Sequence, residues 1–434
     1  MKLYIFILSF LLFACIDQLE RENNNVADLV THIDTYGEAM DSDLTESSMV
    51  VAANYQGFIV YDVNRNDLGN IISVDSIYNN SNMDDTMGDN RAQEVIISKN
   101  HNIAFITDIY DRVWLYKLNN GSSQYVDNYI QDCYGGTWLN VAIDDQFNYI
   151  NVFTLVKHNS SESDDEGTIG DFDEYSTSVV WKRLYDINDA DLFPESNASP
   201  LCEFSYNFGV LPEKISFDNG LLAVSNGELG IKVLKQLNED SCFEEIGQCS
   251  NADYENENDC INEGENWIIT YELLTEFNPT GDIDLDRTIC QQAYDEYYNP
   301  GLNGIYEPSG GFYPYIFSSF DLPGEVNSVF VKDLVVFSGL STSNGCYISL
   351  LGNNGSIINN LSIANGYTIN NISEDNGIIA LSAGHDGVLL YQWNNGLDIE
   401  YLGQIETPYS NHAKVDGDNI IISTEDGVYI YILK

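Results

Sequence analysis

Several polar residues lie in segments that alternate apolar and polar side chains, and such segments could assemble a chemical site. Every second side chain of a β-strand points to the same side. If the innermost strands of neighbouring sheets converge on one axis, their polar residues meet around it. The candidates are Glu94, Asn140, Glu213, Asn327, Asn370 and His412. Carboxylate, amide and imidazole groups could hold a metal ion, as in a metal-dependent hydrolase. The alternative is that they line a water-filled channel.

The five histidines do not belong to any recognised catalytic motif. His32, His101, His158, His385 and His412 are scattered along the chain, and neither GxSxG nor HExxH occurs. A lone histidine in a strand is more often packed or hydrogen-bonded than a ligand. We therefore predict no catalytic residues and interpret the chain as non-enzymatic, with a hydrolase in the central channel as the alternative.

A second group of possible ligands is an acidic loop at 158–175. Its carboxylates are Asp164, Asp165, Glu166, Asp171 and Asp173. Calcium is bound by about six to eight oxygen atoms, and a loop of this composition can supply them. A run of acidic residues is more often a solvated face, so we predict no cofactor, with calcium as the alternative.

A segment at 282–286 imitates the start of an EF-hand loop. Asp282, Asp284 and Asp286 have the right spacing, but Arg287 stands where the loop needs glycine. We interpret these carboxylates as side chains that point the same way on a strand.

Four cysteines lie in a long insertion at 238–311. They are Cys242, Cys249, Cys260 and Cys290. In an exported protein, four cysteines in a segment with few aliphatic residues indicate disulfides, and three connectivities are possible. Zinc is the rival interpretation, although CxxC pairs and nearby histidines are missing. Cys133, Cys202 and Cys346 are left without an assigned partner.

A repeated unit must position these residues. GIIALSAGHDGVLLYQW at 377–393 is matched by NIIISTEDGVYIYIL at 419–433. In each, an Asp-Gly turn joins two apolar runs, as in a tight β-hairpin whose glycine takes a positive φ. Further copies occupy 49–63, 103–118, 221–237 and 334–351, and a degenerate copy spans 147–187. A period of roughly forty residues is typical of a β-propeller blade.

The sequence therefore predicts an all-β fold, a seven-bladed β-propeller of four-stranded antiparallel blades. The last copy lacks an outer strand, and 29–36 can supply it, which closes the ring and leaves no unpaired sheet edge. The propeller would span 29–434. It would carry the disulfide-rich insertion in its fourth blade and the acidic loop in its third.

The hairpin Gly57-Phe58-Ile59-Val60-Tyr61-Asp62-Val63 resembles the LVIVD-repeat family of bacterial β-propellers. The resemblance covers most of the chain after the first 28 residues. Tyr116, Tyr391 and Tyr431 depart from it, because they replace the apolar residue that usually precedes Asp. The resemblance implies a secreted or surface-attached propeller and no established chemistry.

The first fifteen residues, MKLYIFILSFLLFAC, indicate export. One lysine precedes an apolar run of about a dozen residues, which fits a secretory signal. Leu12-Phe13-Ala14-Cys15 resembles a bacterial lipobox, so we predict a signal peptide at 1–14, a lipid on Cys15 and a polar tether at 15–28. The alternative is ordinary cleavage without lipid. The expected location is the cell envelope, at the outer membrane or the cell surface.

The charge limits the choice of partners. The chain has 434 residues and a formal net charge of -51, from 68 acidic and 17 basic residues. This balance argues against binding to nucleic acid or to anionic membrane surfaces. We expect a monomer that binds a protein or a glycan through its loops, with a structural scaffold as a further alternative.

Overall fold

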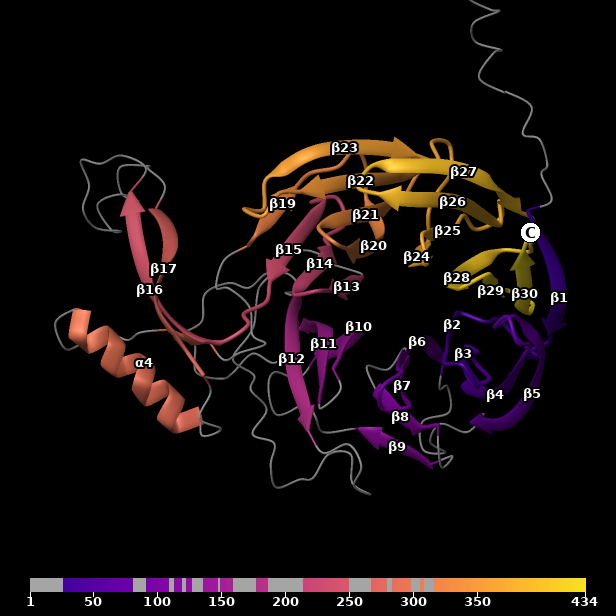
Figure 1. Cartoon of the computed structure of the whole chain (residues 1–434), viewed down its shortest axis with the longest axis horizontal. Helices are drawn as coiled ribbons and strands as arrows, with labels where there is room; N and C mark the ends of the chain where they lie inside the picture. The colour runs from indigo at the N-terminus through magenta and orange to yellow at the C-terminus, as the bar shows by residue number, and fades with distance from the viewer. Residues whose placement is uncertain are drawn as a thin grey trace, which may run out of the picture.

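The computed structural model describes residues 26–80, 91–108, 113–118, 122–126, 136–146, 149–158, 177–185, 214–249, 267–278, 283–297, 305–307 and 316–434. Most of these residues form short strands, and the strands form antiparallel sheets around a common axis (Figure 1). The protein is therefore an all-β propeller.

Six of the sheets are four-stranded blades. The first blade contains β2 (Asp41–Leu44), β3 (Ser48–Ala52), β4 (Phe58–Arg65) and β5 (Ile71–Asn80). The second contains β6 (Ala92–Ser98), β7 (Ile103–Asp108), β8 (Val113–Lys117) and β9 (Ser122–Val126). The third contains β13 (Ile215–Asp218), β14 (Leu221–Ser225), β15 (Ile231–Lys235) and β19 (Ser318–Phe320).

The remaining three follow in chain order. The fourth contains β20 (Val326–Lys332), β21 (Val335–Leu340), β22 (Cys346–Leu351) and β23 (Ile357–Ile363). The fifth contains β24 (Asn371–Asp375), β25 (Ile378–Ser382), β26 (Val388–Asn395) and β27 (Asp398–Ile405). The last contains β28 (Ser410–Asp416), β29 (Asn419–Thr424), β30 (Gly427–Leu433) and β1 (Ala27–Ile33).

The prediction of seven four-stranded blades is wrong in its count, because the described residues form six. The degenerate copy instead gives a three-stranded sheet of β10 (Gly136–Asp145), β11 (Tyr149–His158) and β12 (Thr177–Tyr185). It lies between the blades of β6 and β13, and β10 packs against both of these strands (Figure 1). No fourth strand of this sheet falls within the described part of the chain.

The strand at the N-terminal end of the described chain completes the last blade. β1 runs antiparallel to β30, with Ala27 opposite Leu433 and Ile33 opposite Val428. The predicted closing strand at 29–36 is confirmed, but it begins and ends earlier. The chain turns soon after β1, where Tyr36 has a φ of 57° that is incompatible with a strand.

The core lies between adjacent sheets. The second strand of a blade is covered on both faces, so its side chains are buried almost without exception, as in β3, β21 and β29. Between the blades of β20 and β24, for example, Phe337 meets Trp393 edge-on at 5.2 Å between ring centroids. Aromatic pairs of this geometry add to the stabilisation from burial.

Two hairpin positions require glycine for two reasons, a positive φ and a close contact with the outer strand. Gly387 and Gly427 have φ values of 72° and 130°. A Cβ atom on Gly387 would lie 2.2 Å from the carbonyl oxygen of Ile405, and one on Gly427 would lie 2.2 Å from that of Ile33. Both turns pass so close to the outer strand that only glycine fits.

The insertion forms a separate small sheet. It contains β16 (Asp240–Cys249), β17 (Trp267–Phe277) and β18 (Ile305–Glu307), in the order β17-β16-β18. Helix α4 (Ile283–Tyr297) packs against this sheet, away from the ring (Figure 1). The prediction of a strand for Asp284 and Asp286 is therefore wrong. The packing of α4 on the sheet and its cysteine link decide the local structure there.

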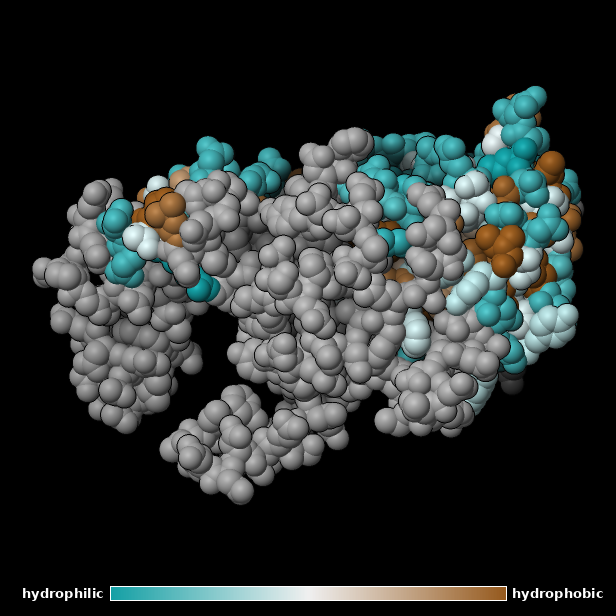
Figure 2. Space-filling model, turned by 90° about the horizontal axis from the view of Figure 1, so that it is seen from below, coloured by the Kyte–Doolittle hydropathy of each residue, from teal (hydrophilic) through white to brown (hydrophobic). Residues whose placement is uncertain are grey.

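On the face shown in Figure 2, the described surface is largely teal (hydrophilic), with brown (hydrophobic) patches at the end of the molecule where β1 and β5 lie. The exposed apolar side chains of these two strands include Leu29, Ile72 and Ile77. No described helix is both long enough and apolar enough to cross a membrane.

Candidate functional site

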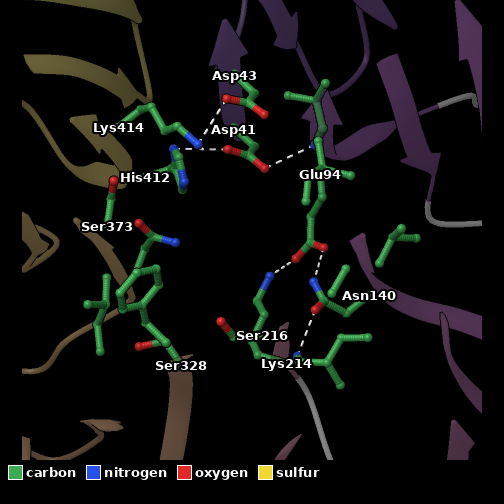
Figure 3. Close-up of a pocket in the computed structure, with 18 of the residues that line it drawn as sticks. Asp41, Asp43, Glu94, Asn140, Lys214, Ser216, Ser328, Ser373, His412 and Lys414 are labelled. Atoms are coloured by element: carbon green, nitrogen blue, oxygen red, sulfur yellow. Dashed lines mark hydrogen bonds and ion pairs between the residues drawn. The ribbon is translucent and has the colours of Figure 1, made fainter. Parts of the chain in front are cut away.

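The inner strands of the sheets surround a central channel with a cavity of about 470 Å³. Residues of β2, β6, β10, β13, β20, β24 and β28 line it. Each of these strands turns alternate side chains toward the axis. The channel is therefore the place where the sheets bring their polar inner residues together (Figure 3).

One wall of the channel joins the first blade to the last by two ion pairs. Asp41 Oδ1 lies 2.9 Å from His412 Nδ1, and Asp43 Oδ1 lies 2.9 Å from Lys414 Nζ. The alternation in DSDL and in HAK places both members of each pair on the channel side.

The same carboxylates also hold the next blade. Asp41 Oδ2 accepts a hydrogen bond from Val95 N–H at 3.0 Å, and Asp43 Oδ2 accepts one from Ile97 N–H at 2.8 Å. A buried carboxylate is stable only when its oxygens are satisfied in this way. Two aspartates thus connect three blades around the axis.

The pKa values reflect these contacts. Burial alone would raise the pKa of Asp41, but the charge and hydrogen bond of His412, the Val95 N–H and Lys214 hold it below the ordinary carboxyl value. Burial alone would lower the pKa of Lys414, but the charge and hydrogen bond of Asp43 raise it above the ordinary amine value. Both groups are therefore held in their charged forms at neutral pH.

The opposite wall carries a second ionic group. Glu94 contacts both Lys214 Nζ and Asn140 Nδ2 (Figure 3). Asn140 Oδ1 in turn accepts a hydrogen bond from Ile215 N–H at 2.7 Å. Burial lowers the pKa of Lys214, and the charge of Asp41 partly opposes this.

The third part of the wall is formed by hydroxyl groups. Ser216 Oγ accepts a hydrogen bond from Val331 N–H at 3.1 Å, and Ser373 Oγ accepts one from Val415 N–H at 3.0 Å. Lys332 of β20 pairs with Glu374 of β24 beside them. As in the rest of the wall, an inner-strand side chain binds the inner strand of a neighbouring blade.

The sequence identified four of the channel residues. Glu94, Asn140, Asn370 and His412 line the cavity as predicted. Asn327 does not line it, and the next residue, Ser328, does. Glu213 lies outside the described residues.

Sequence reasoning missed Asp41, Asp43, Lys214 and Lys414. The signal for three of them was the alternation itself, because Asp41 and Asp43 are two apart and Lys414 is two residues after His412. Their opposite charges would then have suggested that the aspartates pair with the histidine and the lysine.

The other predicted site residues have mixed outcomes. Cys242 and Cys290 form a disulfide, and Cys249 is also disulfide-bonded. Cys346 is a free, buried thiol, and burial raises its pKa to about 12. The predicted positions that lie outside the described residues are Cys15, Cys133, Cys202, Cys260, Asp164, Asp165, Glu166, Asp171 and Asp173.

The channel presents compensated charges. Within the described ranges, the carboxylates of Asp43, Glu94 and Glu374 each contact a lysine, and that of Asp41 contacts His412. The same ranges contain no group of three or more His, Cys, Asp or Glu side chains arranged to hold a metal ion. Such a wall can hold water or a small polar ligand by dipoles and hydrogen bonds.

No protein-family model matches the chain, and no curated protein matches it. The resemblance to LVIVD repeats therefore remains a prediction. Among solved structures, the chain is similar to one in a crystal structure of a mitotic checkpoint complex, with 9% identity, a TM-score of 0.49, and coverage of 96% of this chain and 97% of that one.

Two further structures show a similar level of likeness. A structure of U3-55K has 10% identity and a TM-score of 0.48, over 95% of this chain and 99% of that one. A crystal structure of the RRP9 WD40 repeats has 10% identity and a TM-score of 0.48, over 96% and 99%. The assignment as a propeller rests on the order of strands described above.

Proposed function

We propose that this chain is a non-enzymatic binding protein of the cell envelope and that its insertion at 238–311 recognises a protein partner. One observation carries the proposal. β19 pairs with β15 in regular register, with Ile231 opposite Phe320 and Val233 opposite Ser318. The blade is complete without the intervening sheet and helix, so the insertion serves something other than the ring.

The construction of the insertion supports a binding role. The disulfide between Cys242 and Cys290 joins β16 to α4. A surface that is ordered before binding loses less conformational entropy on association. Leu273 on β17 and Leu285 on α4 are exposed, and they offer apolar contacts to a partner.

The channel supports a non-enzymatic interpretation. Its carboxylates are engaged with lysines and with a histidine across blade boundaries, and two of them also accept backbone N–H groups. Their role in this proposal is to hold the ring together.

The envelope location follows from the first fifteen residues and from the resemblance to LVIVD-repeat propellers. Cys15 would carry the lipid. Replacing Cys15 with alanine should abolish incorporation of labelled palmitate and release the protein from the membrane fraction. Retention in that fraction would count against the anchor.

The binding role is tested by replacing 238–311 with a short Gly/Ser linker. We expect the ring to unfold cooperatively as before, while chemical cross-linking to the partner in intact envelopes is lost. A Cys242→Ser/Cys290→Ser variant is the matched control for the disulfide and should retain weaker cross-linking. Undiminished cross-linking without the insertion would remove it from the proposal.

A further inference from the structure

Two exposed tyrosines lie on touching loops beside the channel. Tyr36 is 80% exposed and Tyr55 is 56% exposed. Their loops are joined by a hydrogen bond from Asn54 Nδ2 to Glu38 Oε2 at 2.9 Å. Both rings therefore belong to one surface of the ring.

The backbone holds Tyr36 in an unusual conformation. Its φ of 57° lies in the left-handed region, where a bulky residue is an outlier. Asp34 Oδ1 fixes the turn by accepting a hydrogen bond from Tyr36 N–H at 2.7 Å. Glycine would adopt this conformation without strain, so the turn maintains a strained residue whose ring faces solvent. Strain of this kind clusters at functional sites.

An arginine completes the surface. The guanidinium carbon of Arg91 lies 3.7 Å from the ring centroid of Tyr55. Arg91 Nε is buried and has no hydrogen-bond partner within the described residues, and the same is true of Asn54 Oδ1. Both atoms are buried, but the Arg91 side chain as a whole is partly exposed, so the rest of its guanidinium belongs to the surface.

The surface continues into the mouth of the channel. Glu38 Oε1 accepts a hydrogen bond from Asn411 Nδ2 at 3.3 Å, and Asn411 lines the cavity. Near it, Asn370 Nδ2 donates to Tyr409 Oη at 3.1 Å, and both of these residues also line the cavity. Amide and phenol groups at this mouth suit an uncharged polar ligand.

We propose that Tyr36, Tyr55 and Arg91 form a binding platform for a neutral oligosaccharide. A net charge of -51 repels anionic ligands, which disfavours acidic sugars. The C–H face of a sugar ring packs against the electron-rich face of an aromatic ring. The remaining N–H groups of the partly exposed Arg91 side chain can donate hydrogen bonds to sugar hydroxyl oxygens.

The test is calorimetric titration of the full chain with neutral hexasaccharides of glucose, mannose, galactose and xylose. At least one should bind. Tyr36→Gly removes the ring and relieves the positive φ, so the variant should fold and bind at least about tenfold more weakly. Tyr55→Ala should weaken binding similarly. Tyr401→Ala is the control, because Tyr401 is an exposed tyrosine on the outer strand β27.

Two results would overturn the proposal. One is that no hexasaccharide binds at about 10 mM, a limit that covers the weakest specific binding. The other is that Tyr36→Gly and Tyr55→Ala bind sugar as well as the unmodified chain does. A protein ligand lost in both variants, with no sugar bound, would assign the platform to a polypeptide instead.

Discussion

Two interfaces between blades are built differently. The seam joins the last blade (β28–β30 with β1) to the first (β2–β5), and it combines an apolar cluster with several polar links between the blades. These links are the pairs Asp41–His412, Asp43–Lys414 and Arg65–Asp416, and a hydrogen bond from Ile71 N–H to Asn419 Oδ1 at 2.8 Å. The interface between the β20 and β24 blades is mainly apolar and aromatic, and it includes the ion pair Lys332–Glu374.

The difference concerns how register is specified. The last blade is assembled from the two ends of the described chain, so its pairing is not imposed by a short connection. Charged pairs have one correct alignment, and a slip would leave them buried and unpaired. Apolar contacts tolerate small shifts. At the seam, polar links therefore specify an alignment that no short connection imposes.

The largest effect is expected from removal of β1. Deletion of residues 1–33 would expose Val428 and Ile430 and lose the burial of Val30 and Ile33. At about 1.5 kcal/mol for each side chain, the loss is about 6 kcal/mol. Urea unfolding measures it. Deletion of residues 1–25 is the control and should leave stability unchanged; a similar loss there would contradict the role of β1.

At the apolar interface, Phe337→Ala should cost about 4 kcal/mol, because it removes a fully buried ring that packs on Trp393. Thermal unfolding measures this loss. Ile358→Ala changes an exposed residue on the outer strand of the same blade and should have little effect. Equal effects of the two variants would show that the interface is not held by burial.

At the seam, Asp43→Asn should cost about 2 kcal/mol, since it leaves the half-buried Lys414 without its charged partner. Glu374→Gln at the other interface should cost less, because Asp43 also holds the next blade through Ile97 N–H, whereas the second oxygen of Glu374 accepts Gly377 N–H within its own blade. Chemical unfolding compares the two. A larger loss for Glu374→Gln would break the proposed distinction between the interfaces.

The contribution of Asp41 to the stability of the seam should depend on pH. The pKa of Asp41 is lower in the folded chain than its ordinary value of 3.8. Its stabilising contribution is therefore present above that pH and is lost as the pH falls through the folded pKa. The stability difference between the unmodified chain and Asp41→Asn should shrink below about pH 4. A difference that stays constant from pH 7 to pH 3 would contradict this.

The smallest effect is expected from Lys99→Ala. Lys99 Nζ lies 3.9 Å from Asp416, and its side chain is 56% exposed. Such pairs contribute under about 0.5 kcal/mol. Thermal unfolding should hardly change, and a loss as large as that of Asp43→Asn would mean that exposure does not separate the two kinds of pair.

The repeats predicted the blades because hairpin turns and apolar runs are local signals. Gly387 and Gly427 mark turns that the fold uses as expected. The degenerate copy and α4 were not predicted correctly, since their form depends on contacts with distant segments. α4 is polar, and its place is set by packing on β16–β18 and by the Cys242–Cys290 link.

The channel was predictable in part for the same reason. Alternation identifies which side chains face the axis, as it did for Glu94 and His412. It does not identify which blade supplies the partner, because that depends on the order of sheets around the ring. Lys214, for example, reaches Glu94 across the intervening strand β10.

The closing blade brings the two ends of the described chain together, so a circular permutant could be made. Ala27 lies opposite Leu433, and Lys434 N–H donates to Val26 carbonyl oxygen at 3.0 Å. Residues 26 and 434 are thus neighbours, and a few added residues could join them. New termini opened at the exposed turn at 66–70 would then give a circular permutant in which β1 follows β30 directly in the chain.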